Sequence, residues 1–198
     1  MLDALVPLIE RGVRVCDGPS ALVSLAESYL AQGIRERAQN RGAMVEFFQR
    51  DGGGSGSAVP WCALFVSSCV RTLARCGFPV RADFRATGRA VSLWQDAGPD
   101  DQIGRGDLFA MDEPRGLVFV RTRLSRPVTD RERALQGTRR QGHTGIVVRV
   151  DGDAVHCIAG NSSGMGDAGT GTGAVAREVI ERGSPAWDRL LGFVRVVL

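Results

Sequence analysis

The chain has 198 residues, a length that fits one domain built around a single hydrophobic core. All 25 basic residues are arginine, yet the formal charge is only +3, an excess too small for a general nucleic-acid binder. The five cysteines are an odd number without Cys-x-x-Cys spacing, which argues against a disulfide framework or a zinc ribbon. Every apolar run is far shorter than the roughly 18 residues of a membrane helix, so we expect no membrane span.

Residues 1–19 are predicted to be an N-terminal extension. Residues 3–15 alternate apolar and charged positions and predict a docking helix, followed by a break at Asp17-Gly18-Pro19. The stretch from Met1 to Ile9 lacks a basic leader and a small-residue cleavage site. We therefore expect synthesis in the cytoplasm without a Sec signal.

Helical periodicity dominates residues 20–96. Ser20 is predicted to cap a helix that ends at Gly33, with an apolar face formed by Leu22, Leu25, Ala26, Tyr29 and Leu30. Further helices are predicted over 42–50, 62–75 and about 87–96, with a flexible loop at 51–57. Cys69 and Cys76 follow Cys62 at steps of seven residues, too far apart along a helix for a disulfide, and are interpreted as small buried residues.

Strand patterns replace the helical ones after Gly98. Strands are predicted over 108–111, 117–122, 144–150, 154–159, 175–180 and 192–197. Helices followed by strands indicate an α+β fold, with N-terminal helices packed on an antiparallel β-sheet, in a domain spanning 20–198. Residues 115–140 contain eight arginines against Asp130 and Glu132, which predicts a basic insertion over about 113–141.

Pro60-Trp61-Cys62 places a cysteine at the start of a predicted helix, directly after a Gly-rich loop. The positive end of the helix dipole favours a thiolate, and the free amides of the first turn can bind an oxyanion. Cys62 is therefore the candidate nucleophile, and the alternative is one more buried helix cysteine. Trp61 is the candidate substrate-binding residue of the cleft, and its alternative is a place in the core.

His143 supplies the histidine that a thiol nucleophile needs. A hairpin with a three-residue loop at 151–153 pairs Val150 with Ala154, so His143 falls opposite Asn161, about 5 Å away at Cβ. In this register Asn161 holds the imidazole, as in Cys-His-Asn proteases, whereas a two-residue loop would turn Asn161 to the wrong face. His156 falls opposite Val148 on the other face and is interpreted as structural.

Metal sites are disfavoured by the same spacing. A zinc site built from His143, His156 and a cysteine would need side chains from opposite faces of the sheet. Asp51 and the pair Asp151 and Asp153 lack an adequate set of oxygen ligands for calcium and are interpreted as solvated turns. We expect no cofactor.

Several motifs in a fixed order carry a family resemblance over about residues 20 to 165. They are Asn40-Arg41-Gly42, Pro60-Trp61-Cys62-Ala63-Leu64-Phe65-Val66, Gly106-Asp107-Leu108-Phe109, Gly142-His143-Thr144-Gly145-Ile146-Val147 and Gly160-Asn161. This series resembles the CHAP family, the cysteine- and histidine-dependent amidohydrolases and peptidases related to NlpC-type enzymes. The resemblance implies a papain-like fold with Cys62 as nucleophile and His143 as general base.

One position departs from the family's pattern. Many members have Glu-Gly-Asn where this chain has Ala159-Gly160-Asn161, so the usual acidic residue is an alanine. Three outcomes stay open: Asn161 alone orients His143, another carboxylate such as Asp107 substitutes, or activity is reduced.

The resemblance implies a monomeric cysteine peptidase or amidase that cleaves stem-peptide amide bonds of bacterial peptidoglycan in the periplasm or cell wall. It implies a phage-type lysin or an effector delivered by a secretion system, the latter with an immunity protein as partner. The bond is either the N-acetylmuramoyl-L-alanine amide or one within the peptide. Two alternatives remain: a catalytically weakened module that binds wall fragments or a partner protein, and an intracellular cysteine peptidase or amidase.

Overall fold

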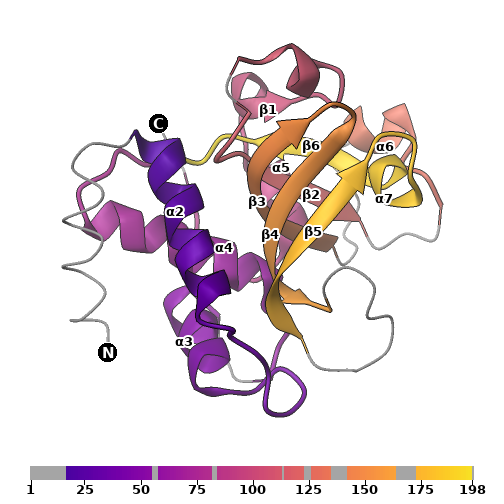
Figure 1. The fold of residues 1–198 in the computed structure, drawn as a ribbon. Coiled ribbons are helices and arrows are strands. Elements are labelled where there is room, and N and C mark those ends of the chain that lie inside the picture. The colour runs from indigo at the N-terminus through magenta and orange to yellow at the C-terminus, as the bar shows by residue number, and fades with distance from the viewer. Residues whose placement is uncertain are drawn as a thin grey trace.

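In the part of the chain that the structure describes, six strands form one antiparallel sheet (Figure 1). The computed structural model describes residues 17–54, 58–81, 84–112, 114–122, 126–134, 142–163 and 173–197. The strands are β1 (Gln102–Ile103), β2 (Val118–Thr122), β3 (Gly142–Asp151), β4 (Ala154–Ser162), β5 (Ala174–Glu181) and β6 (Leu190–Val194). They lie in the order β1-β6-β2-β3-β4-β5.

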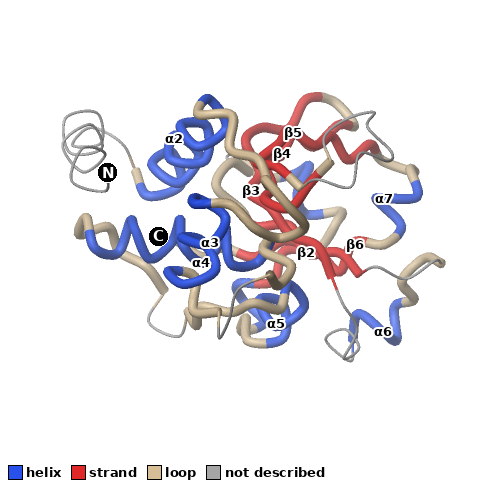
Figure 2. The backbone as a smooth tube through the Cα atoms, turned by 90° about the horizontal axis from the view of Figure 1, so that it is seen from below, coloured by secondary structure: helices blue, strands red, loops and turns tan. Residues whose placement is uncertain are grey.

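The helices pack on both faces of this sheet. They are α2 (Gly18–Ala31), α3 (Ala43–Asp51), α4 (Cys62–Arg75), α5 (Ala90–Gln95), α6 (Asp130–Ala134) and α7 (Pro185–Asp188), with 3-10 turns η1 (Pro99–Asp101) and η2 (Asp107–Ala110). Figure 2 shows α2, α3 and α4 grouped on one side of the strands and α6 and α7 on the other. The predicted α+β class with helices on an antiparallel sheet is confirmed.

Each face of the sheet has its own hydrophobic cluster. The cluster beneath α2 and α4 joins Tyr29, Phe48 and Phe65 to Ile146 and Ile158 of the sheet. The cluster on the opposite face contains Leu108, Phe119, Val147, Cys157, Ile180 and Trp187. Because side chains alternate along a strand, neighbours such as Val147 and Ile146 serve different clusters.

The α4 bounds agree with the sequence prediction, whereas the start of α2 does not. Asp17, not Ser20, caps α2, because its Oδ1 accepts a hydrogen bond of 2.7 Å from the Ser20 backbone N–H. Pro19 lies in the first turn, where a missing N–H costs nothing, so the predicted break is a helix start. Cys69 is fully buried as predicted, but Cys76 is only half-buried. The docking helix predicted over 3–15 lies outside the described residues.

Two strand predictions were wrong. Residues 107–110 form the turn η2 in place of a strand over 108–111, because the Asp107 carboxylate accepts a hydrogen bond of 3.2 Å from the Gly104 N–H and holds a tight turn. The last strand covers 190–194 and not 192–197.

The segment predicted as a basic insertion contributes a central strand. Residues 118–122 form β2, which lies between β6 and β3 and is mostly buried. Residues 130–134 form the short helix α6 beyond it. None of the described helices is long and apolar enough to cross a bilayer.

Candidate active site

Cys62 is the first residue of α4, at the point where this helix meets the sheet. Trp61 and Pro60 precede it, and the Trp61 carbonyl accepts the hydrogen bond of 2.8 Å from the Phe65 N–H that closes the first turn. The Cys62 side chain is 4% exposed, and its Sγ lies 4.0 Å from the carbonyl oxygen of Gly142. The thiol therefore lies next to the beginning of β3.

His143 is the second residue of β3 and is hydrogen-bonded to the Cys62 side chain. Its Nε2 lies 2.7 Å from Oε1 of Glu178, which leaves Nδ1 as the ring nitrogen available to the thiol. Burial acts to lower the pKa of His143, but hydrogen bonds to Cys62 and Glu178 and the negative charge on both groups raise it to about 9. The imidazole is therefore held as an imidazolium at neutral pH.

Glu178 of β5 completes the arrangement. Its Oε2 accepts a hydrogen bond of 3.0 Å from Nη2 of Arg121, and the Ser162 side chain is a further hydrogen-bond partner. Burial acts to raise the pKa of Glu178, but the contacts with His143, Arg121 and Ser162 lower it to about 2. The carboxylate thus stays ionised and fixes the orientation of the imidazole.

The structure places Glu178 where Asn161 was predicted, against the ring of His143. Asn161 lines the same cavity as His143, with its backbone in the left-handed region at φ 54°, and a Cβ on Gly173 would lie 2.5 Å from its Oδ1. Asp107, the other carboxylate considered, instead accepts a hydrogen bond from the Gly104 N–H in the turn that leads into η2. The carboxylate beside His143 therefore comes from β5 and not from position 159 of β4.

The pairing of β3 with β4 has the predicted offset at Ile146 and Val147, but the hairpin turn differs from the prediction. The hairpin turn has two residues, because Asp151 pairs with Ala154 and Arg149 pairs with His156, so His156 does not lie opposite Val148 as predicted. A bulge between Val147 and Arg149 then restores the predicted offset, with Ile146 opposite Ile158.

Trp61 does not line the cleft, and its prediction as a substrate-binding residue is corrected. The indole is fully buried, donates a hydrogen bond of 2.7 Å from Nε1 to Oε1 of Glu36, and stacks on Phe48 at a centroid distance of 5.8 Å. A Cβ on Gly160 would lie 2.7 Å from Cζ3 of Trp61 and 2.6 Å from Cβ of Phe65. Trp61 and Gly160 therefore fix the start of α4 against β4.

A cavity of about 380 Å³ opens beside His143 and Glu178. Its other lining residues are polar or basic: Arg121, Thr122, Asn161, Ser162, Ser163 and Arg189. Among the described residues, Arg189 forms no ion pair, and its Nε donates a hydrogen bond of 2.9 Å to the Pro185 carbonyl. The space next to the imidazole therefore suits a ligand with an acidic group.

Metal binding has no evident site in the described ranges, where no three His, Cys, Asp or Glu side chains are grouped to hold an ion. Glu178 and His143 face the cluster that contains Cys157, whereas His156, the neighbour of Cys157 along β4, points to the opposite side.

No family model, curated protein or solved structure matches the chain.

Proposed function

We propose that this protein is a CHAP-like cysteine hydrolase that cleaves amide bonds in the stem peptides of bacterial peptidoglycan. The observation that carries the proposal is the hydrogen-bonded series Cys62, His143 and Glu178, drawn from α4, β3 and β5. A nucleophile, a base and a group that orients the base are what covalent acyl transfer requires. A papain-like arrangement, with the nucleophile at a helix start packed on an antiparallel sheet, is part of the same proposal.

The first half of the reaction forms a thioester. The Cys62 thiolate attacks the carbonyl carbon of the scissile amide, and N–H groups at the start of α4 stabilise the oxyanion. His143, protonated by its pairing with the thiolate and Glu178, gives a proton to the leaving nitrogen. The C–N bond breaks, and an amine leaves.

The second half returns the enzyme to its starting state. Neutral His143 takes a proton from water, the resulting hydroxide attacks the thioester, and the C–S bond breaks to release a carboxylic acid. The thiolate and the imidazolium are both restored. Throughout the cycle Glu178 accepts the hydrogen bond from Nε2 and holds the ring in one orientation.

The charges around His143 favour a peptide with free carboxylates as substrate. Arg121 and Arg189 line the adjacent cavity, and stem peptides of peptidoglycan carry carboxylates. The alternative of a weakened binding module was motivated by the missing acid at Ala159. Glu178 supplies a carboxylate to His143 from another strand, which favours the enzyme over the binding module.

The test is digestion of purified sacculi of several wall chemotypes, with the new termini identified by mass spectrometry. We expect the protein to release soluble fragments and Cys62→Ala to lower the rate by about 10⁴-fold or more, because the nucleophile is lost. Cys76→Ala at the other end of α4 is the matched control and should digest normally. Casein and small peptide amides are assayed in parallel as alternative substrates.

Two results would contradict the proposal. Cleavage of casein with no release from any wall would assign the site to protein substrates. No hydrolysis of any substrate, with Cys62 alkylated no faster than a free thiol, would leave a binding module as the better description.

A further inference from the structure

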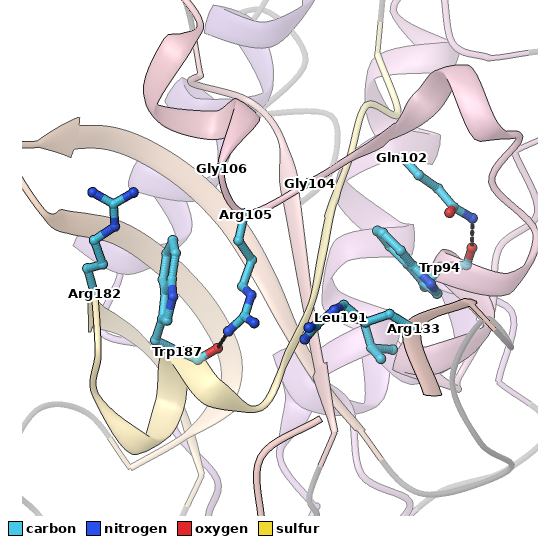
Figure 3. A pocket seen from close by; sticks show the side chains of 9 residues that line it. All are labelled: Trp94, Gln102, Gly104, Arg105, Gly106, Arg133, Arg182, Trp187 and Leu191. Carbon is cyan, nitrogen blue, oxygen red and sulfur yellow. Dashed lines mark hydrogen bonds between the residues drawn. The ribbon is translucent and has the colours of Figure 1, made fainter. Parts of the chain in front are cut away.

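A second cavity, of about 590 Å³, shares no lining residue with the cavity beside His143 (Figure 3). It is bounded by the turn between β1 and η2, by α5, α6 and α7, and by β6. Three of its lining residues are arginines (Arg105, Arg133 and Arg182) and two are tryptophans (Trp94 and Trp187). None of the residues proposed for catalysis lines it, so it needs an explanation of its own.

Arg105 is held firmly at the wall of this cavity. Its Nη1 donates a hydrogen bond of 2.9 Å to the carbonyl oxygen of Trp187, and its Cζ lies 5.7 Å from the centroid of the Trp187 ring. Figure 3 shows the Arg105 side chain alongside Trp187, with the guanidinium of Arg133 between Arg105 and Trp94. A guanidinium fixed by stacking and one hydrogen bond keeps its remaining donors for another acceptor.

The positive charge of Arg105 has no ion-pair partner among the described residues. Burial and the positive charge of Arg133 lower the pKa of Arg105, and the negative charges of Asp188 and Asp130 offset this only in part. Arginine nevertheless stays protonated in proteins, so the charge persists in the cavity wall.

The other two arginines differ from Arg105 in having carboxylate partners. Arg133 is paired with Asp130 through Nη2 and donates from Nη1 to the Val128 carbonyl at 2.9 Å. Arg182 is paired with Asp153 at 3.3 Å and lies on the far side of Trp187 in Figure 3. Arg105 is therefore the arginine of this cavity that has no carboxylate partner among the described residues.

Trp94 provides an independent sign of a missing partner. Its side chain is 5% exposed, and the buried Nε1–H has no hydrogen-bond acceptor in the described part of the chain. Buried donors in native proteins are nearly always satisfied, so an unsatisfied one beside a cavity calls for an acceptor. The charge of Arg105 and the indole N–H of Trp94 are thus two groups at this cavity without a counterpart among the described residues.

We propose that this cavity binds a small molecule through an oxyanion group, a phosphate or a carboxylate, with Arg105 and Arg133 as the binding cations. Both groups accept two parallel hydrogen bonds from a guanidinium, and both supply a negatively charged partner for Arg105. The proposal does not depend on hydrolase activity, because Cys62, His143 and Glu178 take no part in it.

The test is titration of the 198-residue chain with pyrophosphate and, separately, with citrate, followed by calorimetry and by NMR of the three indole N–H resonances. Trp94→Phe and Trp187→Phe assign these resonances. We expect the Trp94 and Trp187 signals to shift on binding, whereas Trp61, which does not line the cavity, should not move. Pyrophosphate binding alone identifies a phosphate ligand, and citrate binding alone identifies a carboxylate ligand.

Charge-neutralising variants decide whether the cavity is responsible. Arg105→Gln is expected to weaken binding about tenfold or more, and Arg133→Gln, which serves if the first variant fails to fold, should act in the same direction. Arg149→Gln removes an exposed arginine of β3 as the matched control and should change affinity by less than about twofold. Cys62→Ala should bind normally, which separates this site from the proposed enzyme activity.

Three outcomes would overturn the proposal. They are no binding of either probe, equal weakening by Arg105→Gln and Arg149→Gln, and binding that leaves the Trp94 and Trp187 resonances unmoved. The second outcome would mean that the probes meet only the general positive charge of the surface.

Discussion

The candidate active site and the cavity lined by Arg105, Arg133 and Arg182 differ in whether the central charged side chain has a partner of opposite charge within the protein. At the site, Glu178 contacts both His143 and Arg121, so these three charged groups have partners within the protein. In the cavity, Arg105 lies over the ring of Trp187 and has no carboxylate at ion-pair distance among the described residues. The proposals for the two regions follow this difference: proton transfer between His143 and its neighbours in the first, and the charge of a bound ligand as the partner of Arg105 in the second.

Glu178→Gln is the substitution with the largest expected effect on the pair of His143 and Glu178, because it keeps the shape of the side chain and removes its charge. We expect the rate of wall digestion to fall by about 10²- to 10⁴-fold, because the imidazolium loses the anion that stabilises and orients it. The pKa of His143 should also move down from about 9, so the basic limb of the pH–rate profile shifts to lower pH. The profile is measured from about pH 5 to about pH 10.

Two variants separate this effect from general damage. Glu181→Gln makes the same charge change at an exposed position of the same strand and should leave the profile unchanged. Asn161→Ala tests the original prediction for the orienting residue. If Asn161→Ala moves the basic limb and Glu178→Gln does not, Asn161 orients His143 and the role given to Glu178 is wrong.

The same pair predicts how stability depends on pH. The pKa of Glu178 is lowered from 4.5 to about 2, so its contribution is complete above pH 4.5 and is lost as pH falls toward 2. The pKa of His143 is raised from 6.5 to about 9, so its contribution is complete below pH 6.5 and is lost as pH rises through 9. The pair therefore stabilises the fold most between these limits, at about pH 4.5 to 6.5.

Urea unfolding at about pH 6 and about pH 10 measures the basic side of this window. The free energy of unfolding should fall by on the order of 1–3 kcal/mol between them, and by clearly less in Glu178→Gln. Glu181→Gln should behave as the unmodified chain. An equal loss in Glu178→Gln would show that groups other than this pair cause the pH dependence.

The sequence allowed α4 and the pairing of Cys62 with His143 to be predicted because their signals are local. Pro60 precedes the helix and Gly77 follows it, while Cys62 is the first residue of α4 and His143 the second residue of β3, two elements with clear patterns. Glu178 was missed because its approach to His143 depends on the pairing of β5 with β4, across the connection at 163–173. The available signal was an acid between Ala176 and Ile180 on one face of a strand.

Trp61 and the hairpin show a second kind of limit. An aromatic residue next to the candidate nucleophile is compatible with a place in the cleft. The Trp61 indole instead donates a hydrogen bond to Glu36, 25 residues earlier in the chain, and hydrophobic periodicity does not reveal this partner. The bulge in β3 is likewise absent from any alternation pattern, because one inserted residue shifts the register without a glycine or proline to mark it.

The smallest expected effect compares two arginines directly, Arg121→Gln and Arg105→Gln. Arg121→Gln removes one of the cations that contact Glu178 and should lower the free energy of unfolding by about 1–2 kcal/mol. Arg105→Gln removes a charge that has no anionic partner, and glutamine retains a donor for the Trp187 carbonyl, so stability should change by less than about 0.5 kcal/mol.

Urea titrations of both variants at about pH 6 and low ionic strength measure the difference. Added pyrophosphate then sharpens the contrast: it should stabilise Arg121→Gln as it does the unmodified chain, because a ligand that binds only the folded state raises stability, and it should stabilise Arg105→Gln much less. Equal destabilisation by the two substitutions without any ligand would mean that Arg105 is a structural cation like Arg121. The two regions would then not differ in whether the charged side chain has a stabilising partner within the protein.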